Sequence, residues 1–185
     1  MNQSAYYGHE SQLFGVEEVR LQGGKGDGMR LLQVPNGKGL EFTVSADRCA
    51  DISRLIFRGE NCGFFSANGY VAPAYYDDKE DGWLKNFTAG FLTTCGLLAV
   101  GAPGEASPLM VLYHMNMGYP LLSEASELYI PAAEVKPRNA HAAEDIDTWN
   151  KVLTPTPGFE EQCYYHVFQD KPGLAAIFNH DRGYG

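Results

Sequence analysis

The stretch Leu109-Met-Val-Leu-Tyr-His-Met-Asn-Met-Gly-Tyr-Pro-Leu-Leu122 decides the fold expected of this chain. It is rich in β-branched and aromatic residues, which favour strands. Successive side chains of a strand point to opposite faces, so Met110, Leu112, His114 and Asn116 would share one face. An imidazole and a carboxamide therefore project together from an otherwise apolar strand.

His114 admits two interpretations at this point. A polar group in an apolar strand needs a hydrogen-bonding partner, because burial without one costs free energy. The partner of a core histidine would be a neighbouring carbonyl group. The partner of a functional histidine would be a polar ligand. Both interpretations stay open from the residues alone.

The segment Tyr113-His-Met-Asn-Met-Gly-Tyr119 resembles the second-histidine strand of the galactose mutarotase-like (aldose 1-epimerase) superfamily, in particular an uncharacterised bacterial branch of it. Further matching blocks are Ala46–Ile52, Gly82-Trp83, Thr93–Leu97, Tyr113–Leu122 and Gly158–Tyr164. These blocks follow the family order through most of the chain. The resemblance implies an all-β fold, an incomplete antiparallel β-sandwich that forms a single domain over residues 1–185.

The rest of the sequence also favours short antiparallel strands. Asn36-Gly37 lies between two apolar runs, a pattern that predicts a hairpin whose two turn residues both have positive φ. Asn139 is expected to cap a short helix over 140–149. Other expected strands cover residues 15–21, 52–57, 126–130, 159–168 and 174–178. Many short strands separated by turns are typical of a β-sandwich.

Composition limits the classes of partner. The 185 residues are 44% hydrophobic and 20% charged, which is typical of a soluble globular protein. A net charge of −9 and the lack of a basic run argue against binding to nucleic acid. Neither a signal peptide nor an apolar run of membrane-spanning length is present, so the expected location is cytoplasmic, with no membrane partner.

The resemblance implies the chemistry of a mutarotase, in which an acid protonates the ring oxygen of a pyranose while a base deprotonates its anomeric hydroxyl. By this resemblance His114 is the acid, and Asn116 or Trp83 positions the sugar. Histidine suits the acid because its side chain exchanges protons near neutral pH. Asp47, Arg48 and Tyr119 are further expected sugar contacts. The alternatives are a structural ion pair at Asp47 and Arg48, and a half-buried core position for Trp83.

Two departures from the family pattern bear on activity. The short link Ala102–Ser107 replaces a family segment that carries another ligand-facing histidine. The catalytic glutamate of the family, which lies on a late strand, has no match. Glu160 and Glu161 are the candidate substitutes, because an apolar environment raises the pKa of a carboxyl group toward a useful value.

Three functions follow as hypotheses. The first is a cofactor-free aldose 1-epimerase-like enzyme that binds a small-molecule sugar. The second is a non-catalytic carbohydrate-binding module, and the third is an inactive, shortened family member. No metal site is expected, because His141 and Glu144 have helical spacing but no further ligands at a recognisable spacing. A sandwich that lacks strands would leave strand edges unpaired, and such edges favour a homodimer.

Overall fold

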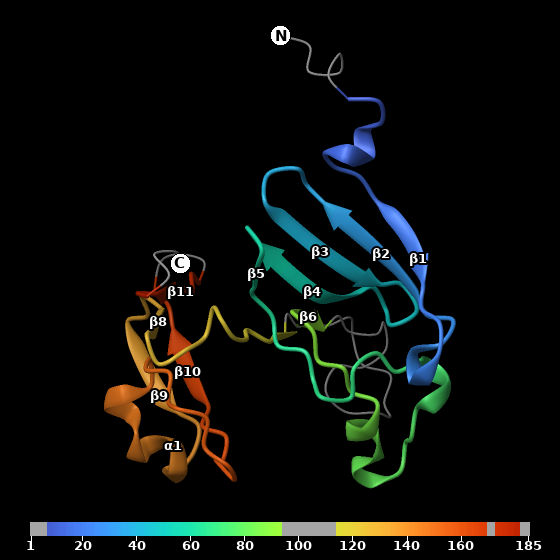
Figure 1. Ribbon diagram of the computed structural model, residues 1–185. Helices are drawn as coiled ribbons and strands as arrows, with labels where there is room; N and C mark the ends of the chain where they lie inside the picture. The colour runs from blue at the N-terminus through green and yellow to red at the C-terminus, as the bar shows by residue number, and fades with distance from the viewer. Residues whose placement is uncertain (1–6, 94–113, 170–172, 182–185) are drawn as a thin grey trace. The chain divides into compact units, whose positions relative to one another are not determined.

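The computed structural model describes residues 7–93, 114–169 and 173–181 (Figure 1). The chain forms two compact units, Met1–Tyr119 (unit 1) and Pro120–Gly185 (unit 2). Both units consist of antiparallel strands with short helices, so the expected all-β class is confirmed. The link Ala102–Ser107 and residues 109–113, which precede His114, lie outside the described residues. No helix in the described parts of the chain has the length and apolarity needed to cross a membrane.

Unit 1 is organised around one antiparallel sheet with the strand order β1-β2-β3-β4-β6-β7, in which β5 pairs with β4. The strands are β1 (Glu17–Arg20), β2 (Arg30–Pro35), β3 (Leu40–Ser45), β4 (Asp51–Phe57), β5 (Glu60–Asn61), β6 (Leu92–Thr93) and β7 (His114–Met115). In the described part of unit 1 the sheet is accompanied by the 3₁₀ helices η2 (Glu10–Gln12), η3 (Gly24–Gly26), η4 (Pro73–Tyr75) and η5 (Glu80–Lys85). The described part of the central histidine strand is therefore short and lies next to β6.

The hairpin between β2 and β3 forms as expected, but its turn differs from the predicted one. Gly37 has a φ of 69°, whereas Asn36 is not among the residues with positive φ. Its side-chain Oδ1 accepts hydrogen bonds from the backbone N–H groups of Lys38 (2.7 Å) and Leu40 (3.0 Å). The asparagine thus organises a wider loop through its side chain, and a left-handed backbone is adopted at Gly37 but not at Asn36 itself.

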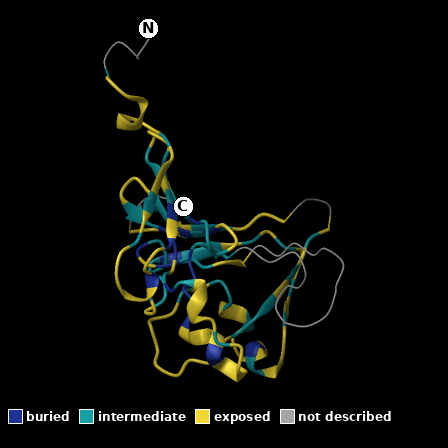
Figure 2. Ribbon diagram, turned by 90° about the vertical axis from the view of Figure 1, so that its right-hand side faces the viewer, coloured by how far each residue is buried: buried dark blue, intermediate teal, exposed yellow. Residues whose placement is uncertain are grey.

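The apolar interior of unit 1 lies against this sheet. Met29, Leu31 and Val71 are almost fully buried, whereas η2 contains no buried residue (Figure 2). The backbone of Gly63 packs tightly against Gly118, where an added Cβ would lie 2.5 Å from the Gly63 carbonyl oxygen. Only glycine fits such a close approach of two backbones. This contact holds the chain after β7 against the segment that follows β5.

Unit 2 contains two separate two-stranded antiparallel sheets, one of β8 (Ser126–Tyr129) with β11 (Ala176–Asn179) and one of β9 (Glu134–Pro137) with β10 (Tyr164–Val167). Asn139 caps helix α1 (Ala140–Glu144) by accepting a hydrogen bond from the Ala142 N–H at 2.9 Å. The helix is shorter than expected, and the 3₁₀ helix η6 (Ile146–Thr148) follows it. Asp145 has a non-helical ψ of 24°, which ends the α-helical hydrogen bonding.

Candidate functional site

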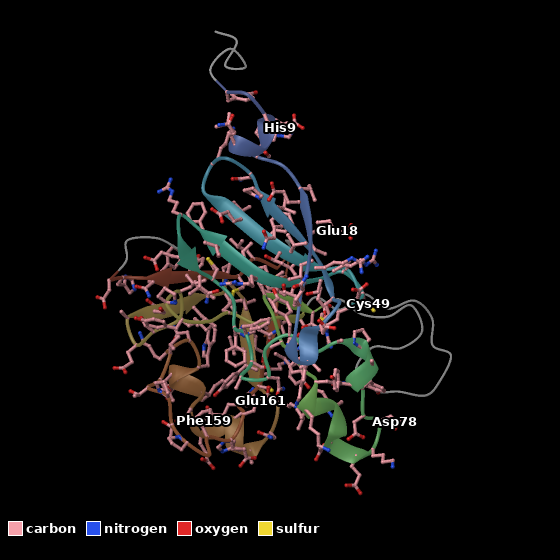
Figure 3. All side chains as sticks on the ribbon, turned by 45° about the vertical axis from the view of Figure 1, so that its right-hand side comes forward. His9, Glu18, Cys49, Asp78, Phe159 and Glu161 are labelled. Atoms are coloured by element: carbon pink, nitrogen blue, oxygen red, sulfur yellow. The ribbon has the colours of Figure 1, made fainter. Side chains whose placement is uncertain are left out.

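A cavity of about 330 Å³ opens in unit 1 beside the turn between β3 and β4. Its walls come from that turn, from η4 and η5, and from β6. Asp47, Arg48 and Trp83, three of the residues expected to contact a sugar, line it together. Cys49, labelled in Figure 3, lies in the same turn and also lines the cavity. Segments far apart in the sequence thus bring charged and aromatic groups to one place.

Arg48 connects the β3–β4 turn to the opposite wall. Its Nη1 donates hydrogen bonds to the carbonyl oxygens of Val71 (3.3 Å) and Asn86 (3.2 Å). Its Nε lies 3.8 Å from Oδ2 of Asp51, and the side chains of Arg48 and Asp51 are only 20% and 7% exposed. The same Nε is buried and has no hydrogen-bond partner among the described residues. The guanidinium group therefore fixes the cavity walls.

Asp47 is held by Arg30 on the neighbouring strand. Its Oδ2 accepts the backbone N–H of Arg30 at 2.7 Å, and its Oδ1 accepts from the guanidinium Nη2 at 2.9 Å. These hydrogen bonds, the backbone one first, lower the pKa of Asp47 below its ordinary value. Asp47 and Arg48 are thus each engaged in an ion pair, but with different partners, Arg30 and Asp51.

A row of polar side chains crosses the sheet toward His114. Ser45 pairs with Asp51, and Thr93 pairs with His114. Ile52 pairs with Leu92 in the antiparallel β4–β6 ladder, so Asp51 lies opposite Thr93 in the same register. Residues opposite one another in antiparallel strands share a face of the sheet, with Cβ atoms about 5 Å apart. The row therefore leads from two cavity-lining residues, Asp51 and Thr93, to His114.

Two members of this row, Thr93 and His114, carry polar groups that could bind a ligand. The Oγ1 atom of Thr93 is buried and has no hydrogen-bond partner in the described parts of the chain. The side chain of His114 is exposed, so this imidazole is accessible to solvent. The interpretation of His114 as a sealed core histidine is therefore wrong for the described structure. His114 stands on β7 and does not line the 330 Å³ cavity itself.

Trp83 stands on η5 with 43% of its surface exposed, and its ring makes an edge-to-face contact with Phe87 at 5.4 Å. Asp77 pins this helix, since its carboxylate accepts from the Lys79 N–H (3.1 Å) and pairs with Lys85 (3.0 Å). Tyr76, which is 60% exposed, provides a second aromatic group in the cavity wall. The indole of Trp83 is thus exposed at the cavity, on a helix held by Asp77, and is not packed in a core.

Asn116 and Tyr119 do not line this cavity. The side-chain Nδ2 of Asn116 donates to the carbonyl oxygen of Gly90 at 2.8 Å, a bond that fixes the backbone next to β6. Tyr119 is 72% exposed and lines another cavity of unit 1, of about 540 Å³, together with Asn61 and Phe64. The structure therefore gives both residues places away from Arg48 and Trp83.

Glu160 and Glu161 belong to unit 2, in the exposed segment between Phe159 and β10 (Figure 3). The expected strand over 159–168 is wrong in extent, because β10 spans only Tyr164–Val167. The side chain of Gln162 binds Asp145 Oδ2 (2.6 Å) and the His141 carbonyl oxygen (3.3 Å). These bonds tie the segment to α1 in place of a strand partner. His114 lies in the other unit.

Metal ligation has little support among the described side chains. His141 Nδ1 lies 3.7 Å from the Glu144 carboxylate, the pair whose helical spacing was considered for a metal. Within residues 7–93, 114–169 and 173–181, no cluster of three or more His, Cys, Asp or Glu side chains could hold a metal ion. The pair is an ordinary contact within one turn of α1.

Sequence reasoning missed several cavity residues. Tyr76, Asn86 and Thr93 line the cavity, and only the aromatic content of the loop before η5 gave a signal for the first of them. Asp51 offered a clearer signal, because it follows Arg48 by three residues and can form an ion pair at that spacing. Asn86 contributes through its carbonyl oxygen, which no side-chain pattern reveals.

Comparisons with known proteins give a family and a fold. Residues 26–107 and 104–185 match the profile of the family described as Domain of unknown function (DUF4432). The two matches meet at residues 104–107, inside the link Ala102–Ser107. No curated protein matches the sequence.

Among solved structures, the chain is similar to that of a putative aldose 1-epimerase from Klebsiella pneumoniae subsp. pneumoniae MGH 78578. The TM-score is 0.73 with 20% sequence identity, over 93% of this chain and 67% of that chain. The likeness shows the fold and confirms the expected aldose 1-epimerase-like β-sandwich class.

Proposed function

The chain belongs to the DUF4432 family, and from this membership and its fold we propose that it binds a pyranose sugar in the unit 1 cavity beside Arg48 and Trp83. One observation carries the proposal: the cavity is lined by an exposed indole and by Asp51 and Thr93, and these two polar residues begin a row across the sheet that ends at His114. A flat aromatic ring suits the C–H face of a pyranose, and a few fixed polar groups suit its hydroxyls.

In the enzymatic form of the proposal, His114 protonates the ring oxygen and the ring opens at C1. Rotation about the C1–C2 bond and reclosure then give the other anomer. The mechanism also needs a base that takes the proton of the anomeric hydroxyl, and Glu160 and Glu161 stay predictions for that role. Asn116 and Tyr119 stay predictions as sugar contacts. The protein on this proposal acts in the cytoplasm on a small-molecule sugar and needs no cofactor.

A specific observation favours the second candidate, a carbohydrate-binding module without turnover. The two carboxylates that line the cavity, Asp47 and Asp51, both lie in ion pairs, with Arg30 and Arg48. An ion-paired carboxylate is stabilised in its charged form and is a weaker base. The described cavity lining therefore offers the sugar a binding surface more readily than a general base.

Exchange spectroscopy by NMR on α- and β-glucose and galactose separates these candidates. For the enzyme, we expect wild-type protein to accelerate anomer exchange above buffer and His114→Ala to slow it by about 10²–10⁴-fold. The matched control is His180→Ala, which removes another exposed histidine. A wild-type rate equal to buffer eliminates the enzyme.

Binding is measured in the same samples. A Trp149→Phe variant leaves Trp83 as the single tryptophan of the two in the sequence. Saturable sugar-dependent quenching of Trp83 without exchange would select the binding module. If neither sugar changes Trp83 emission at any concentration and no exchange occurs, the proposed site is wrong.

The homodimer expected from unpaired strand edges is a separate part of the proposal. The small sheets β8–β11 and β9–β10 each have two strands, and short sheets of this kind present backbone N–H and C=O groups along their edges. Light scattering coupled to size-exclusion chromatography tests it. A mass near the 20.4 kDa of one chain at all concentrations contradicts it.

A further inference from the structure

Unit 2 contains a cavity of about 460 Å³ built from its own residues. Its lining includes Trp149, Gln162, Tyr164 and His166, together with residues of the loop that precedes Phe159. Gln162, Tyr164 and His166 alternate along the chain, so they point to the same face of β10 and its lead-in. This volume falls in the range of small-molecule sites, roughly 300–1,000 Å³.

The aromatic part of the lining is held in place by a contact between two rings. The rings of Trp149 and His166 make an edge-to-face contact with centroids 4.7 Å apart. The His166 Nδ1 atom is buried without a hydrogen-bond partner among the described residues, and burial lowers the pKa of this imidazole. A partly buried imidazole whose neutral form is favoured thus packs against the indole.

The polar part of the lining is a set of side chains connected by hydrogen bonds. Gln162 Nε2 donates to Asp145 Oδ2 at 2.6 Å, and the Tyr164 hydroxyl lies 3.5 Å from Gln162 Oε1. Burial, aided by the nearby Asp145 charge, raises the pKa of Tyr164, so its hydroxyl stays a donor. A carboxylate held by an amide has acceptor capacity left for additional hydroxyl groups. The donors and acceptors are thus set in place before any ligand arrives.

The charges of the lining argue against an anionic ligand. Lys151 is the one cationic side chain among the lining residues, and its Nζ lies 3.8 Å from a Glu127 carboxylate oxygen. Asp145 contributes a negative charge on the same lining. Phosphate recognition uses uncompensated Arg or Lys groups or a helix N-terminus, and this lining supplies no such cation. A mixture of aromatic faces, hydroxyls, an amide and a carboxylate instead suits a neutral polyhydroxylated ring.

We propose that this cavity is a second carbohydrate-binding site, which takes an uncharged pyranose ring with one face on Trp149 and hydroxyls on Asp145 and Tyr164. The site uses unit 2 residues alone and does not depend on turnover or on the unit 1 cavity. Exposed apolar groups at its rim, Leu153 (57%) and Phe159 (52%), extend the surface on which a longer saccharide would lie.

The test uses a Trp83→Phe protein, in which Trp149 is the single remaining tryptophan. Methyl α-glucoside and methyl α-galactoside are titrated in, because their blocked anomeric oxygen cannot undergo exchange. We expect saturable changes in Trp149 emission, and an increase in Kd of about tenfold or more in Asp145→Asn, from loss of a hydrogen bond to a charged group. Asp147→Asn is the matched control, since this nearby acid does not line the cavity.

Three results would overturn the proposal. They are no saturable change with either glycoside, equal affinities for the Asp145→Asn variant and its parent, and calorimetric binding of adenosine or glucose 6-phosphate in preference to the glycosides. Circular dichroism melts establish that each variant is folded. Because Trp83 reports on unit 1 in the Trp149→Phe protein, failure of this site is distinguishable from failure of the proposed function.

Discussion

The two units stabilise their cavities in different ways. In unit 1, a seven-stranded sheet accompanies buried apolar groups such as Met29 and Val71, and the buried carboxylate of Asp51 lies beside the partly buried guanidinium group of Arg48. In unit 2, the buried residues of the described part are small or polar: Pro120, Ser126, Ala142 and Asn179. Unit 1 therefore depends on a sheet with one buried ion pair, whereas unit 2 depends on hydrogen bonds between short ribbons and loops.

This difference indicates which substitutions should destabilise each unit most. A sheet resists the loss of one contact, but an ion pair taken out of water is costly to break. Two-stranded sheets are marginal alone, so their polar side-chain contacts carry a larger share of the stability. Substitutions that remove single polar groups in each unit measure these shares directly.

The largest effect is expected for Arg48→Ala. The change removes two hydrogen bonds to carbonyl oxygens and the ion pair with Asp51, and should lower the free energy of unfolding of unit 1 by about 3 kcal/mol. Urea denaturation followed by Trp83 fluorescence in the Trp149→Phe background measures it. Arg54→Ala, at an exposed position on β4, is the matched control. Equal losses for the two variants would contradict a structural role for Arg48.

Asn179→Ala should have the next largest effect. The amide nitrogen of Asn179 is within 3.2 Å of four oxygen atoms, of Pro120, Leu121, Ser123 and Ser126, and the residue is 3% exposed. Leaving those oxygens without this donor should cost about 2 kcal/mol in the unfolding of unit 2. Trp149 emission in the Trp83→Phe background is the measurement. Asn150→Ala, which loses one side-chain bond to Glu127, should cost clearly less.

Trp83→Ala should weaken pyranose binding in unit 1 about tenfold, equivalent to about 1.4 kcal/mol, because the sugar loses the indole face. Isothermal titration calorimetry in an Asp145→Asn background measures this loss while binding in unit 2 is weakened. Leu84→Ala is the control, since Leu84 is exposed on the same η5 helix but does not line the cavity. Unchanged affinity in Trp83→Ala would remove the indole from the proposed site.

The smallest effect is a pH dependence of unit 2. Burial lowers the pKa of His166 below its ordinary value of 6.5, so protons bind the unfolded chain in preference to the folded one. The free energy of unfolding should therefore be unaffected above pH 6.5 and decline as the pH falls from 6.5 through the folded-state pKa. Denaturation of the Trp83→Phe protein across this range measures the slope. A slope that persists unchanged in His166→Gln would assign it to another group.

Several elements of the fold could be read from local chemistry. Strand β4 lies within one residue of the predicted range 52–57, and β2 and β3 flank Asn36-Gly37 as predicted, because alternating apolar residues and an Asn-Gly turn are local signals. The cap at Asn139 was predictable for the same reason. The strand expected over 159–168 failed, because Gln162 uses its side chain to bind α1, and no local pattern reveals that long-range contact.

The candidate site divides in the same way. Asp47, Arg48, Trp83 and His114 could be singled out from the sequence through their resemblance to the mutarotase-like pattern. The partners of these residues could not be predicted. Arg30 pairs with Asp47, whereas Asp51 and two backbone carbonyl groups bind Arg48. The side-chain amide of Asn116 donates to the Gly90 carbonyl oxygen. Backbone carbonyl partners leave no trace in the residue types.

The sequence by itself determined the all-β class, the hairpins, and which polar residues stand in apolar strands, because strand period and turn chemistry act over a few neighbouring residues. Only the tertiary structure decided that Arg48 and Trp83 meet around one cavity, that Asp51, Thr93 and His114 form a row across three strands, and that the rings of Trp149 and His166 meet edge to face in unit 2. Those arrangements depend on strand register and on loop packing between distant segments. The interactions that stabilise these arrangements form only when segments distant in the sequence come into contact.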